Sequence, residues 1–252
     1  MDNIPAIEIS NVSFGFDRNP VLVDVNLRVN RGEFVSIVGP NGGGKTSLLK
    51  IMLGLIKAQT GEVKINGKSP DKSSRLIGYM PQSLEYDPQF PVTVMDVVLM
   101  GRLGGNWHGF YTKQDRQLAY RALEEVGVSD VADRMFSSIS GGQRQRVLLA
   151  RTIAGDPEIL LLDEPTANID LSIQNKLHSI LAELNNRMTI IMVTHDFGFV
   201  SSMVENVFCV NRKVVRHPTA QITPESLRRL YGEDMRVVLH DELFRNGRSS
   251  DA

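Results

Sequence analysis

The clearest chemical signal in the chain is the run Gly39-Pro-Asn-Gly-Gly-Gly-Lys-Thr46. It follows the apolar, β-branched segment Glu33–Val38 and precedes Ser47–Leu53, which has the composition of a helix start. Strand, glycine-rich loop and helix together are the context of a P-loop, in which backbone N–H groups and the helix N-terminus attract phosphate. We predict that Lys45 reaches the β- and γ-phosphates of a nucleotide and that Thr46 places its hydroxyl on Mg²⁺. A glycine-rich turn that binds nothing is the disfavoured alternative.

Two further strands are predicted to end in polar groups. The apolar run Ile159–Leu162 leads into Asp163 and Glu164, and the run Thr189–Val193 leads into His195. In a parallel sheet the carboxyl ends of the strands meet the ligand crevice. We therefore expect Asp163 to hold Mg²⁺, Glu164 to polarise a water molecule, and His195 to make a polar contact with the γ-phosphate. Solvated acids at an exposed strand end are the alternative.

Two other segments suit the same ligand but are weaker signals. Gln82 ends a predicted strand that begins at Ile77, so it could touch Mg²⁺ or the attacking water, although an exposed loop glutamine is the better interpretation of this residue alone. The run Ser140-Gly-Gly-Gln143 precedes a helix predicted over Gln143–Ala154, with Ser140 as its N-cap. This second helix N-terminus could also bind phosphate.

The first part of the chain alternates in apolarity over Ile7–Phe14 and again over Val21–Val29. This pattern predicts two paired strands joined by the turn-rich segment Gly15–Pro20. Phe14 and Phe16 flank the turn, and one of them could stack on a nucleotide base. The alternative that both rings belong to the core stays open, and it is weaker for Phe16.

The stretch from about Leu84 to Arg151 differs in character from the rest. Thr93 and Thr112 each stand three residues before an aspartate, which is the pattern of a helix capping box. The loop between the two helices contains Trp107 and Phe110, whose rings could cover the hydrophobic core or contact a partner. This part of the chain is predicted to be a helical lobe inserted into an α/β core.

Composition excludes some classes of protein. The chain has 252 residues, and 28 Lys and Arg against 29 Asp and Glu give a net charge of −1, which argues against a dedicated nucleic-acid binder. Cys209 is the single cysteine, so no disulfide can form within the chain and a reducing compartment fits. The start Met1–Ala6 lacks a signal peptide pattern, and the apolar runs are too short to span a bilayer. We expect a soluble protein that acts on a membrane only through a partner.

Taken together, these motifs resemble the nucleotide-binding subunit of ATP-binding cassette (ABC) transporters over about Ile7 to Arg216. They stand in the order of that family: residues 39–46, Gln82, 140–143, 160–164, 165–170 and His195. The departures are small and remove no catalytic group. Ile139 replaces the usual leucine, Gly43 stands where alanine or serine is frequent, residues 167–170 vary a more usual Leu-Asp ending, and Phe16 replaces an adenine-stacking tyrosine.

The resemblance implies a fold and a division of the chain. The fold would be α/β: a P-loop NTPase (RecA-like) core with an antiparallel β subdomain and an inserted α-helical subdomain. The ATPase domain would span residues 1–217, with its core in 1–83 and 152–217 and the helical subdomain in 84–151. Residues 218–252 would form a C-terminal tail.

The resemblance also implies ATP and Mg²⁺ as cofactors and assigns their contacts. Glu164, His195 and Gln82 would be catalytic, and Thr46, Gln82 and Asp163 would hold the metal ion. The residues that would contact ATP are Phe16, Gly39, Pro40, Asn41, Gly42, Gly43, Gly44, Lys45, Thr46, Ser47, Ser140, Gly141, Gly142, Gln143 and Asp170. A second copy of the chain would complete a head-to-tail dimer, in which each ATP lies between the P-loop of one copy and Ser140–Gln143 of the other, with Asp170 reaching across. The helical lobe would bind a membrane permease near Gln82.

Within the family, Phe90–Arg102 and Tyr231–His240 look most like importers of zinc or manganese. We therefore expect an ATP-hydrolysing subunit, peripheral on the cytoplasmic face of the membrane, that drives metal uptake through a permease and indirectly a substrate-binding protein. An importer of iron-siderophore or cobalamin is the alternative within transport. A soluble cassette ATPase of DNA repair or the ribosome is disfavoured by the single cassette and the lack of heptads or a basic patch, and Glu164 argues against a switch that hydrolyses little.

Overall fold

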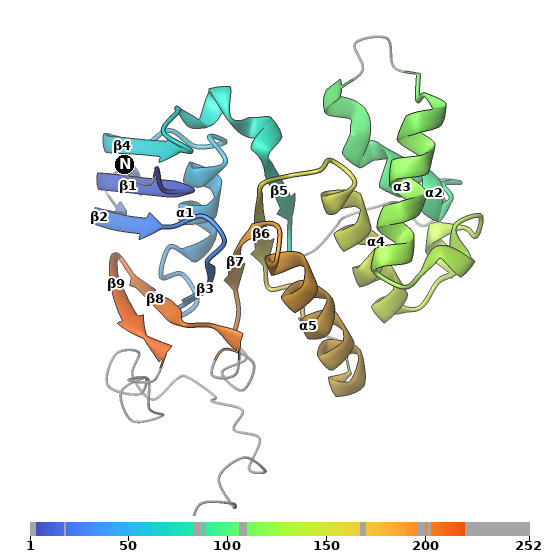
Figure 1. Ribbon diagram of the computed structural model, residues 1–252. Helices are drawn as coiled ribbons and strands as arrows, with labels where there is room; N and C mark the ends of the chain where they lie inside the picture. Colours follow the sequence, from blue (N-terminus) through green and yellow to red (C-terminus); the bar gives the residue numbers. More distant parts are fainter. Residues whose placement is uncertain are drawn as a thin grey trace, which may run out of the picture.

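The computed structural model describes residues 4–17, 19–82, 87, 89–105, 110–166, 170–195, 200 and 203–219. Figure 1 shows how their elements are arranged. The strands are β1 (Ile7–Phe16), β2 (Asn19–Val29), β3 (Phe34–Val38), β4 (Thr60–Ile65), β5 (Ile77–Met80), β6 (Ile159–Asp163), β7 (Thr189–Val193), β8 (Asn206–Asn211) and β9 (Lys213–Pro218). The α-helices are α1 (Lys45–Met52), α2 (Val94–Leu99), α3 (Lys113–Glu125), α4 (Gly141–Ile153) and α5 (Leu171–Asn185). Short 3₁₀ segments are η1 (Pro70–Lys72), η2 (Ser74–Leu76), η3 (Met100–Gly105), η4 (Ser129–Val131) and η5 (Phe136–Ser138).

The larger sheet has the strand order β5-β6-β7-β3-β8-β9, and its first five strands run parallel. Every residue of β3, β6 and β7 is buried, as expected for apolar strands that are covered on both faces. Alternate residues of these strands join two different apolar clusters, one with α1 and the other with α4 and α5. The parallel arrangement places the carboxyl ends of β3, β5, β6 and β7 along one edge of the sheet.

The smaller sheet is antiparallel, in the order β2-β1-β4, and confirms the pairing expected for the first two strands. Helix α1 lies between this sheet and the larger one in Figure 1, and side chains of all three share a buried apolar cluster. The backbone N–H of Val23 in β2 donates to the Arg212 carbonyl between β8 and β9 at 2.7 Å, which ties the two sheets together. The expected last hairpin, β8 with β9, is also present, and β9 extends to Pro218.

Helices α2, α3 and α4 gather beyond the edge strand β5 (Figure 1). Both expected capping boxes are present, with Thr93 on Asp96 and Thr112 on Asp115. Helix α4 begins at Gly141, two residues earlier than predicted, because its N-cap Ser140 forms a third capping box. The segment with Trp107 and the tail after residue 219 lie outside the described residues, and the limits of the helical subdomain at 84 and 151 stay a prediction.

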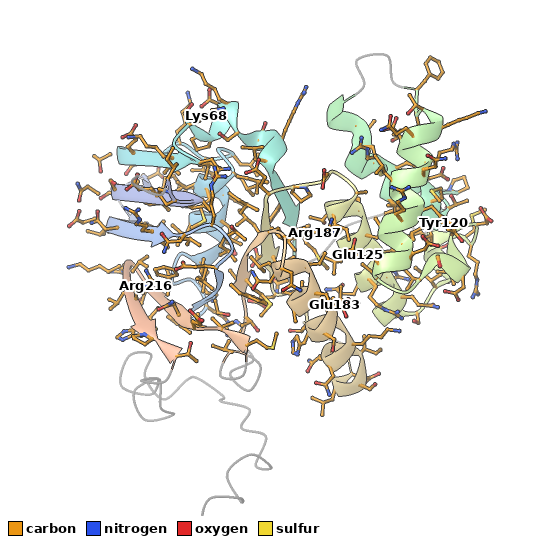
Figure 2. The ribbon with its side chains drawn as sticks, in the orientation of Figure 1. Lys68, Tyr120, Glu125, Glu183, Arg187 and Arg216 are labelled. Atoms are coloured by element: carbon orange, nitrogen blue, oxygen red, sulfur yellow. The ribbon has the colours of Figure 1, made fainter. Side chains whose placement is uncertain are left out.

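Helix α5 is an element that the sequence analysis did not assign. Its buried side chains Leu177, Ile180, Leu181 and Leu184 follow the spacing of one helix face, which is the signal that could have revealed it. Directly after the helix, Arg187 donates from Nη2 to both carboxylate oxygens of Glu125 at 2.7 and 2.8 Å. Figure 2 shows these two side chains facing each other between α5 and the end of α3.

Phe136 tests how far the stability of the helical group, which consists of α2, α3 and α4, depends on its own packing. This side chain is only 1% exposed within the cluster formed by α2, α3 and α4. We expect Phe136→Ala to lower the free energy of unfolding by roughly 3–5 kcal/mol, because it leaves a cavity in close-packed surroundings. Phe90, which is 62% exposed, supplies the matched control, and Phe90→Ala should change stability by less than about 0.5 kcal/mol. Urea unfolding of both variants measures this, and equal losses would contradict the packing described.

Candidate nucleotide-binding site

The glycine-rich loop connects β3 to α1 and lies close to the β8–β9 hairpin. A Cβ on Gly39 would stand 2.1 Å from the Val210 carbonyl oxygen, and a Cβ on Gly43 would stand 2.8 Å from the same atom. The short distance at Gly43 explains why glycine suits position 43, where the family that the motifs resemble often has a larger residue. Gly44 adopts a positive φ of 103° and caps α1 without any side-chain hydrogen bond. The first N–H groups of the helix therefore face the loop without a side-chain acceptor, which suits an anion.

Lys45 is the cation of this loop. Its side chain is 7% exposed overall, and its Nζ donates to the carbonyl oxygens of Gly39 at 2.9 Å and Pro40 at 3.0 Å. Burial lowers the pKa of Lys45, while the nearby charges of Glu164 and Asp163 act in the opposite direction. The loop thus holds a positive charge over backbone atoms where phosphate oxygens would be neutralised.

Thr46 and Asp163 form the oxygen-rich part of the site. The Thr46 hydroxyl donates to Asp163 Oδ2 at 3.3 Å, and Asp163 is 4% exposed at the end of β6. Burial raises the pKa of Asp163, and the Thr46 hydrogen bond opposes that shift. A hydroxyl beside a carboxylate fits Mg²⁺, which prefers oxygen ligands and takes few of them from the protein when phosphate is present. Among the described residues no cluster of three or more His, Cys, Asp or Glu could hold a metal ion by itself.

Glu164 stands at the centre of a polar trio drawn from three neighbouring strands. Its Oε2 accepts a hydrogen bond from Gln82 Nε2 at 2.8 Å, and its Oε1 lies 3.0 Å from His195 Nε2. The His195 hydrogen bond is the main cause that lowers the pKa of Glu164, with burial acting against it. The carboxylate is therefore ionised at neutral pH. Glu164 also adopts a positive φ of 50°, a conformation that costs a non-glycine residue free energy and recurs at functional sites.

The other expected contact residues lie apart from this trio. Phe14 is 7% exposed in the core, whereas Phe16 is 59% exposed and meets it edge to face at 5.0 Å, so Phe16 is the ring open to a ligand. Ser140 and Gln143 bond to each other through the capping box at the start of α4. Asp170 precedes α5 without capping it through its side chain.

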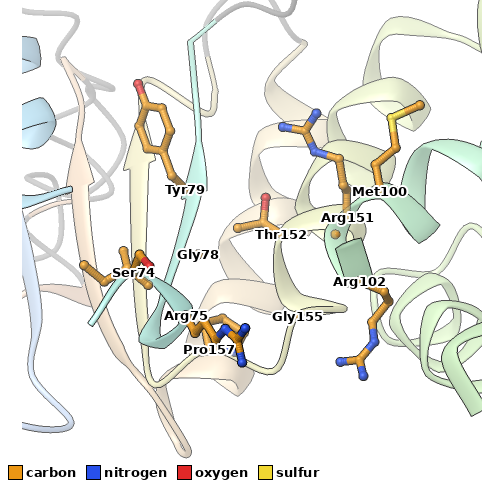
Figure 3. A pocket seen from close by; sticks show the side chains of 12 residues that line it. Ser74, Arg75, Gly78, Tyr79, Met100, Arg102, Arg151, Thr152, Gly155 and Pro157 are labelled. Atoms are coloured by element: carbon orange, nitrogen blue, oxygen red, sulfur yellow. The ribbon is translucent and has the colours of Figure 1, made fainter. Parts of the chain in front are cut away.

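A pocket of about 480 Å³, which the sequence did not reveal, lies between β5 and the helical group (Figure 3). Arg75, Arg102 and Arg151 line it together with Tyr79 and Met100. Asp115 accepts a hydrogen bond from Arg102 Nε at 3.1 Å, while burial lowers the pKa of Arg151. The three arginines come from η2, η3 and α4, which are far apart in sequence, so only the fold brings their charges together.

Comparison with known proteins identifies the family. A family model described as ABC transporter matches residues 22–167, which is more than half of the chain. The chain belongs to the ABC transporter family. It is an ABC ATPase, which couples ATP hydrolysis to transport.

Curated relatives cover most of this ABC ATPase. A probable metal transport system ATP-binding protein of Chlamydia muridarum is 45% identical over 82% of this chain and 88% of its own length. The manganese transport system ATP-binding protein MntB of Bacillus subtilis is 36% identical over 96% and 98%, respectively. The zinc transport system ATP-binding protein TroB of Treponema pallidum is 36% identical over 90% and 87%.

Solved structures agree with the fold of this ABC ATPase. An inward-facing transporter described as of the metal-chelate type matches with a TM-score of 0.81 and 31% identity, over 90% of this chain and 88% of that chain. A bacterial ABC transporter cassette solved as a dimer matches with a TM-score of 0.74 and 29% identity, over 84% and 98%. In the part of the chain that the structure describes, no helix is both long and apolar enough to cross a membrane.

Glu164→Gln tests the centre of the trio. This change removes the negative charge and keeps the shape, so we expect ATP binding to persist while turnover falls by at least about a hundredfold, as for loss of a general base. Steady-state ATPase assays and a binding isotherm measure the two effects. Glu183, an exposed residue of α5 (Figure 2), gives the matched control Glu183→Gln, which should keep wild-type turnover. Normal turnover in Glu164→Gln would rule out the base.

Proposed function

We propose that this ABC ATPase energises the uptake of a transition metal ion, zinc or manganese, through a partner permease. The observation that carries the substrate is the identity of 36% or more, over most of each chain, to relatives named for metal, manganese and zinc transport. The site itself supports hydrolysis and says nothing direct about the transported ion. A subunit with this task would be peripheral on the cytoplasmic face of the membrane.

The geometry gives each residue of the site a proposed role. The loop 39–46 binds the phosphates, with Lys45 neutralising them and Phe16 stacking on the base. Thr46 and Asp163 hold Mg²⁺, which when bound neutralises charge that develops between the β- and γ-phosphates. The ionised Glu164 accepts a proton from the attacking water. Gln82 and His195 hold that carboxylate in place through their hydrogen bonds to its two oxygens.

We propose that two copies of the chain form the head-to-tail sandwich. Ser140–Gln143 is a capped helix start in which the side chains of Ser140 and Gln143 accept from each other's backbone N–H groups, and a Cβ on Gly141 would meet no atom within 4 Å. An open helix N-terminus of this kind suits phosphate from another copy. The cassette with 29% identity that was solved as a dimer supports the formation of a dimer.

We also propose that the permease docks at the pocket between β5 and the helical group. The pocket is lined by β5 residues just before Gln82, so a permease segment bound there would lie close to the polar trio. Arg102 is already paired with Asp115, and the guanidinium groups of Arg75 and Arg151 favour a segment with acidic side chains.

A mixed dimer tests whether the Ser140 motif acts on the nucleotide of the other copy. Ser140→Arg places a bulky charge at the partner's γ-phosphate, and Lys45→Ala disables the P-loop of its own chain. Mixing the two variants puts both lesions in one composite site and leaves the other intact, so some ATPase activity should return that neither variant has alone. If heterodimers form and remain inactive, the motif does not act across an interface.

Elemental analysis tests the transported ion. Deletion of the gene should lower cellular zinc or manganese and impair growth in chelated medium, and the missing ion should restore growth. A wild-type copy should restore the metal content, whereas a Lys45→Ala copy should not, because hydrolysis drives uptake. Unchanged zinc and manganese under limitation would reject the metal ion as cargo. A fall in iron or cobalt instead would favour a chelate importer, which the similarity to the metal-chelate type transporter makes the second candidate.

A further inference from the structure

The turn that follows Glu164 is held by side chains from two helices. Gln145 of α4 donates from its side-chain amide to the carbonyl oxygen of Pro165. One residue later, Gln174 of α5 donates from Nε2 to the Thr166 carbonyl oxygen at 3.3 Å. Pro165 and Thr166 are both buried, and buried carbonyl groups in folded proteins are paired with a donor. The turn after β6 therefore depends on α4 and α5 for its position.

The backbone of Glu164 is strained, so its position depends on the bonds around it. Its φ of 50° is positive, and a non-glycine residue keeps such a conformation only where the surrounding structure enforces it. The Glu164 N–H donates to the Val193 carbonyl oxygen of β7 at 3.0 Å. On the other side, the bond from Gln145 holds the carbonyl of Pro165. The strained residue thus lies between one hydrogen bond to the sheet and another from α4.

The carboxylate of Glu164 is oriented by a separate set of bonds. Gln82 and His195 contact its two oxygens and set its direction. The backbone, in contrast, sets the point from which the side chain starts. A displacement of about 1 Å, caused by a change far from the reacting atoms, can cost about a hundredfold in rate. A residue that fixes the backbone beside Glu164 therefore affects the reaction from a distance.

The start of α4 places Gln145 beside this turn. A Cβ on Gly142 would stand 2.6 Å from Cδ1 of Ile173 in the first turn of α5, so the two helices approach closely here. Gln145 follows Gly142 by three residues, and its amide reaches the turn between β6 and α5. The helix that begins with the Ser140 motif is therefore bonded to the segment next to Glu164 of the same chain.

We propose that Gln145 is a positioning residue, whose amide holds the Pro165 carbonyl and thereby keeps the Glu164 carboxylate where it meets the attacking water. The inference rests on the proposed role of Glu164 as the general base. It requires neither the identity of the transported ion nor the permease.

Gln145→Met removes the N–H donor and keeps a side chain of similar length. We expect kcat for ATP hydrolysis to fall about tenfold, because the base is displaced but still present. The KM for ATP and the affinity for ATPγS should stay within about twofold of the wild type, because the glycine-rich loop is unchanged. Steady-state ATPase assays and a binding isotherm measure these quantities.

A double-mutant cycle with Glu164→Gln tests whether Gln145 acts through Glu164. Residues that act as one unit are not additive, so adding Gln145→Met to Glu164→Gln should lower the residual turnover by less than about twofold. Single-turnover hydrolysis of radiolabelled ATP measures these low rates. A further loss of about tenfold in the double variant would show that Gln145 acts independently of Glu164, and it would overturn the proposal.

Gln117→Met is the matched control. Gln117 is an exposed residue of α3, and its variant should keep wild-type kcat and KM. Unchanged kcat in Gln145→Met would overturn the positioning role. A loss of ATPγS affinity as large as the loss of kcat would also overturn it, because it would indicate a general structural effect.

The single variant Glu164→Gln separates this inference from the role on which it rests. If Glu164→Gln keeps wild-type turnover, the assignment of the general base is itself wrong. If the turnover of Glu164→Gln falls while Gln145→Met keeps wild-type kcat, only the role of Gln145 is wrong.

Discussion

The parallel alignment of strands β3, β5, β6 and β7 is the constraint on which the candidate site depends. Parallel strands end at the same edge of a sheet, so residues from four distant parts of the chain arrive together. The glycine-rich loop follows β3, Gln82 follows β5, Glu164 follows β6 and His195 follows β7. Each of these strands is apolar and largely buried, which fixes its register and therefore the position of the polar residue after it.

Charge balance follows from this arrangement. Lys45, Asp163 and Glu164 are brought close enough to influence one another's pKa in surroundings that penalise an isolated charge. Burial lowers the pKa of Lys45 and raises that of Asp163, whereas the hydrogen bond from His195 lowers that of Glu164. The two acids, although adjacent in sequence, therefore have opposite pKa shifts. That difference suits one carboxylate that meets a metal ion and another that stays ionised beside water.

The sequence was sufficient to predict those features whose signal lies within a single segment. The loop 39–46 lies between a strand and a helix, the capping boxes of Thr93 and Thr112 form as their spacing indicates, and apolar runs that end in acids become buried strands. It was insufficient where the signal depends on contacts between segments. The three arginines of the pocket cannot be recognised from spacing, since they are separated by dozens of positions. Helix α5 was not predicted, although its buried apolar side chains recur at the spacing of one helix face.

A crystal structure of the Glu164→Gln variant with Mg-ATP tests the central claim most directly, which is that the strand ends and the glycine loop form one Mg-ATP site. The account predicts ATP on the loop 39–46 with Lys45 on its phosphates, Mg²⁺ at Thr46 and Asp163, and a water molecule beside residue 164. It also predicts Ser140–Gln143 of a second copy on the other side of the nucleotide. ATP bound away from the loop, or Mg²⁺ held without Thr46 and Asp163, would contradict the account.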